Sequence, residues 1–224
     1  MREPINVSGM VLSASPVGEY DKRVVILTRE LGKITAFARG ARRMKSPLMA
    51  VSNPFVFGEF QVYEGRDSYT LSGANIKEYF LDLAQMQPGV YYGFYFLELA
   101  EYFGQEGNDE TQMLNLLYVT MNAIRRGKQD LRLIRCIFEL RTITISGEAP
   151  QMFSCMECGT KENLTIFSPR DSAIYCQNCG KTIRDPWPLQ PGTVLACRYI
   201  IAAPLEKLYG FTVNEEILDE LERL

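Results

Sequence analysis

Histidine is absent from this chain of 224 residues, and its absence removes several kinds of chemistry at once. Without an imidazole there is no Ser–His or Cys–His nucleophilic pair, no histidine proton shuttle and no histidine ligand for a metal. The phosphate-binding pattern G-x-x-x-x-G-K-S/T is also missing. We therefore predict a protein that is not an enzyme. Pairs of carboxylates could still serve a metal-assisted hydrolase or transferase, so that alternative stays open.

Long apolar runs are missing as well. No stretch of about 18 uncharged apolar residues occurs, so the sequence predicts no membrane span. Residues 1–11 hold no apolar segment of the signal-peptide kind. Six cysteines spread over a chain of this length do not resemble a secreted disulfide framework. We therefore expect a cytoplasmic location, at the nucleoid if the protein binds DNA.

A general excess of positive charge is the third absence, since the formal net charge is −3. The first third of the chain differs from the rest. Residues 1–76 carry ten Lys/Arg against seven Asp/Glu, whereas residues 77–150 and 151–224 each carry seven against ten. Binding of nucleic acid would have to rest on local charge, and the basic and acidic parts are expected to meet different partners.

The pattern of apolar residues predicts an α+β protein. About five short strands are expected in the first 70 residues or so, as a small barrel requires. They are residues 5–15, 23–28, 34–39, 57–63 and 69–71. The boundary between a strand-rich domain, 1–76, and a helical domain, 77–224, follows. Within the latter, residues 89–104 are apolar on most sides and are expected to be buried, and residues 192–208 and 213–224 are predicted as the last helices.

Two C-x-x-C-G motifs interrupt the helical region and indicate a zinc site. Their cysteines, Cys155, Cys158, Cys176 and Cys179, leave seventeen residues between the two pairs, which is within the usual spacing of a four-cysteine zinc site. Four thiolates close the tetrahedral shell of Zn²⁺, so we predict one structural zinc in a segment spanning 153–187. Redox-active or merely buried thiols are the alternative. The two remaining cysteines lie in apolar helical patterns and are expected to be buried: Cys136 and Cys197.

The densest positive run lies between a predicted strand and a proline, and it indicates contact with phosphates. Its cations are Arg39, Arg42, Arg43 and Lys45, and the same predicted domain adds Lys22, Arg23 and Lys33. Aromatic residues that could stack on bases are Tyr20, Phe37, Phe60, Tyr63 and Tyr69. For both groups a plainer interpretation stays open, because loop cations are often only solvated and strand aromatics often belong to the core.

The order of these features resembles the RecO family of bacterial recombination mediators along the whole chain. The most specific likeness is the run from Arg39 to Ser46, with Gly32-Lys33 before it and Asn53-Pro54-Phe55 after it. The opening strand and the late four-cysteine segment add support. The resemblance implies an N-terminal OB-fold barrel, a helical domain and an inserted zinc-finger segment. Because some members of the family lack the cysteines, the zinc prediction rests on the residues themselves.

The same resemblance implies a function and a set of partners. Members bind single- and double-stranded DNA and anneal complementary strands. With RecR they assist the loading of RecA onto DNA coated by single-stranded DNA-binding protein. The acidic C-terminal tail of that protein ends in phenylalanine, and it would need cations beside apolar residues. Arg132 and Arg135, in the helical region, are the predicted contacts. A zinc-containing adaptor that binds only proteins is the alternative function.

Overall fold

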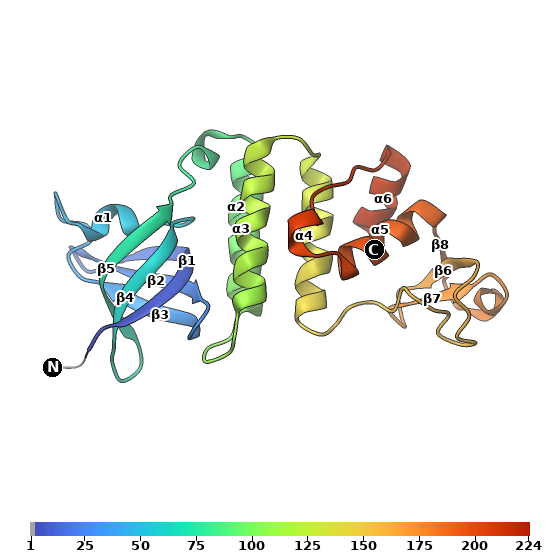
Figure 1. Ribbon diagram of the computed structural model, residues 1–224, viewed down its shortest axis with the longest axis horizontal. Coiled ribbons are helices and arrows are strands. Elements are labelled where there is room, and N and C mark those ends of the chain that lie inside the picture. Colours follow the sequence, from blue (N-terminus) through green and yellow to red (C-terminus); the bar gives the residue numbers. More distant parts are fainter. Residues whose placement is uncertain (1–2) are drawn as a thin grey trace. The chain divides into compact units, whose positions relative to one another are not determined.

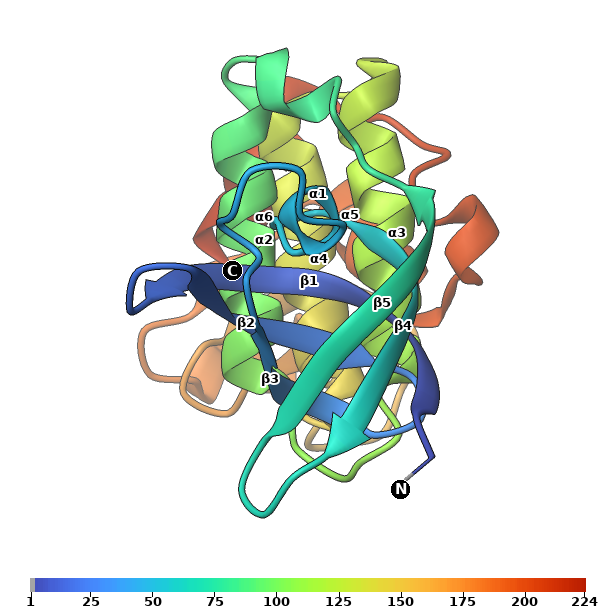
Figure 2. The ribbon, with the colours of Figure 1, turned by 90° about the vertical axis from the view of Figure 1, so that its left-hand side faces the viewer.

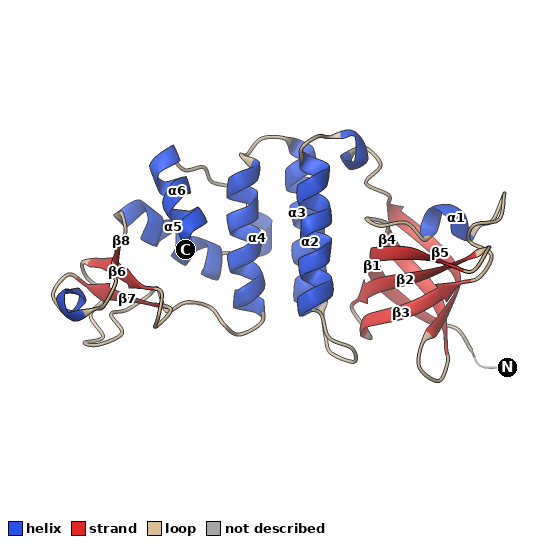
Figure 3. Ribbon diagram, turned by 180° about the vertical axis from the view of Figure 1, so that it is seen from behind, coloured by secondary structure: helices blue, strands red, loops and turns tan. Residues whose placement is uncertain are grey.

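The structure is a computed structural model that describes residues 3–224 (Figures 1 and 3). Its residues group into two compact units, Met1–Arg125 and Arg126–Leu224. The first unit holds a β-barrel and two long helices. The second holds three helices and a small sheet that carries the cysteine segment. No helix among the described residues is long and apolar enough to span a bilayer.

Five strands of the first unit close into a barrel with the order β1-β2-β3-β5-β4 (Figure 2). The strands are β1 (Ile5–Val17), β2 (Asp21–Thr28), β3 (Gly32–Ala38), β4 (Phe57–Glu64) and β5 (Tyr69–Glu78). Neighbours pair antiparallel, except that β3 and β5 pair parallel. Along β3 every second residue is buried, so Ile34 and Ala36 point into the core while Thr35 and Phe37 point outward. The predicted small barrel is confirmed.

Two details of the barrel differ from the sequence-based expectation. β5 extends to Glu78, well past the predicted residue 71, because residues 72–78 contain glycine and polar residues that hide the strand pattern. The chain between β3 and β4 also forms a short helix, α1 (Leu48–Val51). Leu48 and Val51 belong to the buried core of the barrel, so this segment closes the core as well as connecting two strands.

The turn at Gly32 needs a glycine for two reasons. Its backbone has a φ of +69°, which side-chain-bearing residues rarely adopt. A Cβ at this position would lie 2.2 Å from the carbonyl oxygen of Gln105. The backbone amide of Lys33 donates to that same oxygen at 2.8 Å. The start of β3 is therefore fixed against the segment that follows the first long helix.

That helix, α2 (Gly89–Phe103), buries one face and exposes the other. Phe96, Leu97 and Ala100 are buried, and the helix packs on β1 and β2 of the barrel. The opposite face exposes tyrosines, with Tyr102 81% exposed. The expectation that residues 89–104 are buried on all sides is therefore wrong. A tyrosine is apolar along its ring but ends in a hydroxyl group, so it tolerates water on an outer face.

The second unit places the cysteine segment beside a helical bundle. Its elements are α4 (Leu131–Ile145), β6 (Leu164–Ser168), β7 (Ala173–Cys176), β8 (Trp187–Pro188), α5 (Pro191–Ala202) and α6 (Glu215–Arg223), while α3 (Thr111–Arg126) ends at the boundary between the units. β6 and β7 form an antiparallel hairpin. The helix predicted at 192–208 is too long, because α5 ends at Ala202 shortly before Pro204, which cannot continue it.

Candidate metal centre and nucleic-acid interface

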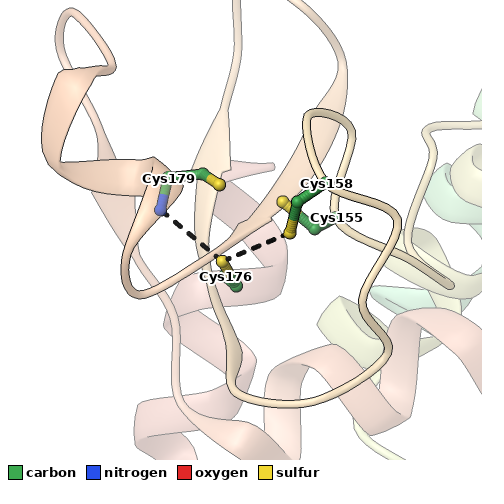
Figure 4. Close-up of side chains that lie close together, drawn as sticks. All are labelled: Cys155, Cys158, Cys176 and Cys179. Carbon is green, nitrogen blue, oxygen red and sulfur yellow. Dashed lines mark hydrogen bonds between the residues drawn. The ribbon is translucent and has the colours of Figure 1, made fainter.

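The four cysteines of the two C-x-x-C-G motifs gather at one point (Figure 4). All their Sγ atoms lie within 4.8 Å of one another, and those of Cys158 and Cys176 are 3.9 Å apart. A tetrahedral site with metal–sulfur bonds of about 2.3 Å places its sulfurs about 3.8 Å apart. The predicted gathering of these residues is confirmed, and the donor set can hold one metal ion.

Each motif is a tight turn whose backbone faces the sulfurs. Gly159 has a φ of +71° and donates its amide to the carbonyl oxygen of Cys155 at 2.9 Å. In the second motif the amide of Cys179 donates to the Sγ atom of Cys176 at 3.5 Å. A Cβ on Gly180 would come within 2.6 Å of the side chain of Ile166. Glycine follows each cysteine pair because the first turn needs a positive φ and the second has no room for a side chain.

Backbone hydrogen bonds favour the thiolate form in this cluster. Burial raises the pKa of Cys155, but amide groups, led by those of Cys158 and Cys176, outweigh it and bring the pKa to about 6. The amide of Cys179 likewise lowers the pKa of Cys176. The pKa of Cys179 rises to about 12 because its thiol shares a hydrogen bond with Cys176. Thiolates are the form that binds metal, so the turns prepare the cluster for an ion.

The other two cysteines are confirmed as core residues. Cys136 is 5% exposed and Cys197 is 2% exposed. Burial raises the pKa of Cys136 to about 11 and that of Cys197 to about 12. Both thiols therefore stay protonated near neutral pH and act as small apolar side chains.

The basic run between β3 and α1 is an exposed loop, which we call the basic loop and define as residues 39–47. Arg39, Arg42, Arg43 and Lys45 are all exposed. Backbone and side-chain bonds fix the loop to the β1–β2 turn. The amide of Arg42 donates to the carbonyl oxygen of Tyr20 at 2.8 Å, and its guanidinium donates to that of Gly18 at 3.1 Å. The guanidinium of Arg43 lies 4.9 Å from the centre of the Tyr20 ring. The loop therefore presents its cations from a defined position.

The other predicted cations of the barrel differ in how far their charged groups are already bonded to neighbouring residues. Lys22 donates to the side-chain oxygen of Asn53 at 2.7 Å, and burial followed by the charge of Arg42 lowers its pKa. The ammonium of Lys33 donates to the carbonyl oxygen of Glu101 at 2.6 Å. Arg23 is exposed, and the guanidinium makes one long contact of 3.4 Å with the hydroxyl of Thr35 within the described residues. Arg23 is thus more accessible to a ligand than the two lysines.

An open groove of about 800 Å³ runs along the outer side of β2 and β3 and under the β4–β5 hairpin. Its lining includes three cations, Arg23, Lys33 and Arg66, two aromatic rings, Phe37 and Tyr69, and three acidic residues, Glu64, Asp67 and Glu106. OB-folds bind oligonucleotides on the face of strands 2 and 3 and at the loops β1–β2 and β4–β5, and the groove includes that face and the second of these loops. Sequence reasoning missed Arg66, whose only signal was a cation between two predicted strands, 57–63 and 69–71.

The candidate stacking residues separate into two groups. Phe60 is 0% exposed and belongs to the barrel core, so its prediction as a stacking residue is wrong. It alternates inward along β4 with Val62. Tyr20 and Tyr63 are exposed, and Phe37 lines the groove. The rings available to a nucleic acid therefore lie on the outer side of the barrel, as the pleat of the strands requires.

Arg132 and Arg135, the predicted partner contacts on α4, face the carboxylates of α6. Arg132 pairs with Glu215, with Asp219 at 2.5 Å and with Glu222 at 2.6 Å. Arg135 pairs with Glu222 at 2.7 Å. The hydrogen bond from Arg132 is the first cause that holds the pKa of Glu222 below its usual range. These ion pairs fasten α6 to α4, so any acidic partner would have to compete with them.

Comparison with known proteins decides the family. The family description "Recombination protein O N terminal" matches residues 1–80, and "Recombination protein O C terminal" matches residues 89–224. This chain belongs to the RecO family. Three RecO proteins illustrate the likeness, and each is named DNA repair protein RecO. The relative from Alkaliphilus metalliredigens is 33% identical over 98% of this chain and 90% of its own length.

The relatives from Acetivibrio thermocellus and Bacillus pumilus are 28% and 30% identical over 98% of this chain, covering 88% and 86% of their own lengths. RecO is a family of DNA repair proteins and not a known family of enzymes. An OB-like barrel, a helical region and a four-cysteine cluster in this order agree with the architecture of RecO.

Proposed function

We propose that this protein is a recombination mediator that binds single- and double-stranded DNA and anneals complementary strands. With RecR it assists the loading of RecA onto DNA coated by single-stranded DNA-binding protein, in the cytoplasm at the nucleoid. One observation carries the DNA-binding part. In a RecO chain with a net charge of −3, exposed cations and aromatic rings gather on the side of the barrel where OB-folds bind nucleic acid.

The basic loop and the groove would contact different parts of a bound DNA strand. Arg39, Arg42, Arg43 and Lys45 are proposed to contact phosphates, and each contact releases counterions from the strand. Arg23 and Arg66 hold the backbone in the groove while Phe37 and Tyr69 stack on bases. Lys22 and Lys33, whose ammonium groups already have partners, add positive potential. Phosphate contacts carry no base information, so binding is not specific for sequence.

Annealing would follow from charge neutralisation alone, without a catalytic step. Two strands repel through their phosphates, and a protein that covers those charges lets complementary bases meet. We expect the protein to speed the pairing of two complementary oligonucleotides several-fold in the absence of ATP, with no further gain when ATP is added. A quenched-fluorophore pairing assay measures this rate. ATP hydrolysis that one point change in this chain abolishes would contradict the absence of an enzyme centre.

We propose Zn²⁺ as the ion of the four-cysteine cluster, in a structural role. Cys155, Cys158, Cys176 and Cys179 offer only thiolate ligands, which suit zinc, and four of them leave no open position for water. Zinc would supply tetrahedral cross-linking of the two turns and no chemistry on a substrate. The chain's own contribution is the set of amides that favours the thiolates.

The contact with the acidic tail of single-stranded DNA-binding protein is proposed at Arg132 and Arg135. Their guanidinium groups are shared with Glu222, so the tail carboxylates would replace or join that residue. Charge reversal of each arginine, one at a time, is expected to weaken binding of a labelled tail peptide several-fold. Unchanged affinity in both variants places the tail elsewhere.

An adaptor that binds only proteins is the second candidate function. It is favoured by the exposed tyrosines of α2, which are typical of protein interfaces. A titration with single-stranded DNA separates the two functions, because an adaptor alone has no salt-dependent affinity for DNA.

A further inference from the structure

The outer face of α2 carries a regular stripe of four residues, which we call the tyrosine face: Tyr91, Tyr95, Glu98 and Tyr102. Their spacing of four, three and four residues puts them on one side of the helix, over about 16 Å. Tyr91 is 62% exposed and Tyr102 is 81% exposed. The residues on the other side of the helix form the core that packs on the barrel. The stripe therefore exposes large apolar rings to solvent on the side of the helix that faces away from the core.

The carboxylate of this face lies between two of the rings. Glu98 follows Tyr95 by three residues and precedes Tyr102 by four, so both are its neighbours along the helix surface. Glu98 is exposed, and it has no ion-pair partner among the residues that the structure describes. A shallow hollow of about 540 Å³ is lined by Glu98, Glu101, Tyr102 and Lys33. The ammonium of Lys33 is bonded to the carbonyl oxygen of Glu101, and two carboxylates against one ammonium leave the hollow negative.

This combination selects one kind of ligand group. A carboxylate accepts two parallel hydrogen bonds from a guanidinium, and a guanidinium stacks on an aromatic ring. Lysine offers a point charge without the planar stacking surface. A phosphate backbone is disfavoured, because Glu98 and Glu101 repel it. In Figure 1, α1, which directly follows the basic loop, lies on the far side of the barrel from α2. The tyrosine face is thus separate from the basic loop, while its hollow shares Lys33 with the groove.

We propose that the tyrosine face docks a partner protein through exposed arginine side chains. One arginine pairs with Glu98 and stacks on Tyr95 or Tyr102. Tyrosine and arginine are the residues that most often dominate the affinity of protein interfaces. This role goes beyond DNA binding and leaves the basic loop free to hold a strand while the partner is bound.

The test uses the full chain and two helical peptides that differ only in their cations. One carries arginine at two positions four residues apart, and the other carries lysine there. Chemical-shift titration of the isotope-labelled protein is expected to move the amide signals of α2, with the arginine peptide binding at least about fivefold more tightly. Glu98→Gln is expected to weaken the arginine peptide about tenfold, and Tyr102→Leu about fivefold.

Matched changes outside the face serve as controls. Glu206→Gln removes one exposed carboxylate and Tyr79→Leu one partly exposed ring, and both are expected to leave the peptide affinity unchanged. All four variants should keep the parental melting temperature and the parental affinity for single-stranded DNA. The DNA measurement separates this proposal from the proposed function, because each can fail without the other.

Four results would overturn the proposal. The first is an absence of α2 shifts up to millimolar arginine peptide, and the second is equal binding of the arginine and lysine peptides. The third is a loss of single-stranded DNA binding in Tyr102→Leu, which would make the face a stacking platform for bases. The last is a concentration-dependent dimer in sedimentation that Tyr102→Leu abolishes, which would make the face a contact between two copies of this chain.

Discussion

Replacing Cys176 by serine is expected to remove the metal from the protein and to unfold residues 153–187. Cys176 ends β7, and its Sγ atom lies 3.9 Å from that of Cys158. Binding of zinc to such a set is coupled to folding and contributes about 10 kcal/mol or more in isolated zinc fingers. Loss of one ligand is therefore expected to cost at least about 4 kcal/mol of folding free energy in this segment.

Metal analysis of the purified, reduced protein gives one measurement, and limited proteolysis gives the other. We expect one zinc per chain in the parent, none in Cys176→Ser, and new cleavage within 153–187. Cys197→Ala is the matched control, because it removes a thiol that is buried elsewhere in the same unit. That control should keep its zinc and lose only about 1 kcal/mol of stability from packing. A parent without zinc, whose Cys155 and Cys158 are freely alkylated in the native state, would refute the site.

The double variant Arg42→Ala with Arg43→Ala is expected to bind single-stranded DNA about 25-fold more weakly near 0.1 M salt. Each phosphate contact raises the binding constant by the salt concentration, in molar units, to the power of about −0.7, which is about fivefold at 0.1 M. Losing two contacts therefore weakens binding by about the product of the two factors. The loss should be the same for oligonucleotides of different sequence, because the arginines meet phosphates and not base edges. Annealing should slow in parallel.

The control for this loss has to remove the same charge. Arg126→Ala with Lys128→Ala takes away two exposed cations outside the barrel, and it should leave DNA binding within about twofold of the parent, because neither residue belongs to the basic loop or lines the groove. Arg42 also holds the loop to Gly18, so the melting temperature is measured in both variants. We expect it to change little, because exposed arginines contribute little to stability. An equal loss of DNA affinity in both double variants would mean that the effect comes from the change in net charge and not from the basic loop.

The sequence was informative wherever local pattern decides structure. Alternation along β3 separates inward Ile34 from outward Phe37, and the two cysteine motifs fix their own turns. Contacts between residues far apart in the chain leave no local pattern from which they could be predicted. Arg132 meets Glu222 ninety positions away, and no periodicity in α4 indicates that pair. Phe60 on β4 and Phe37 on β3 are the same residue type, and the register of each strand in the barrel decides which ring is buried.

Arg66 was missed in the sequence for the same reason. Arg66 joins the groove because the β4–β5 hairpin bends beside β3, a feature of the closed barrel and not of the hairpin sequence. The tyrosine face of α2 was hidden in another way. Its rings count as apolar in any pattern, although Tyr91 and Tyr102 are mostly exposed. Composition alone cannot tell a buried aromatic helix from one that presents an interface.

The most direct test of the central claim is the salt dependence of single-stranded DNA binding by the parent and by Arg42→Ala with Arg43→Ala. The slope of the logarithm of the binding constant against the logarithm of the salt concentration counts phosphate contacts. If the basic loop of the barrel binds the strand, the slope of the double variant should be smaller in magnitude by about 1.4, at about 0.7 per arginine. An unchanged slope would contradict the account and would move the contact to other cations, with Arg170, Lys181 and Arg184 of the cysteine segment as the next to test.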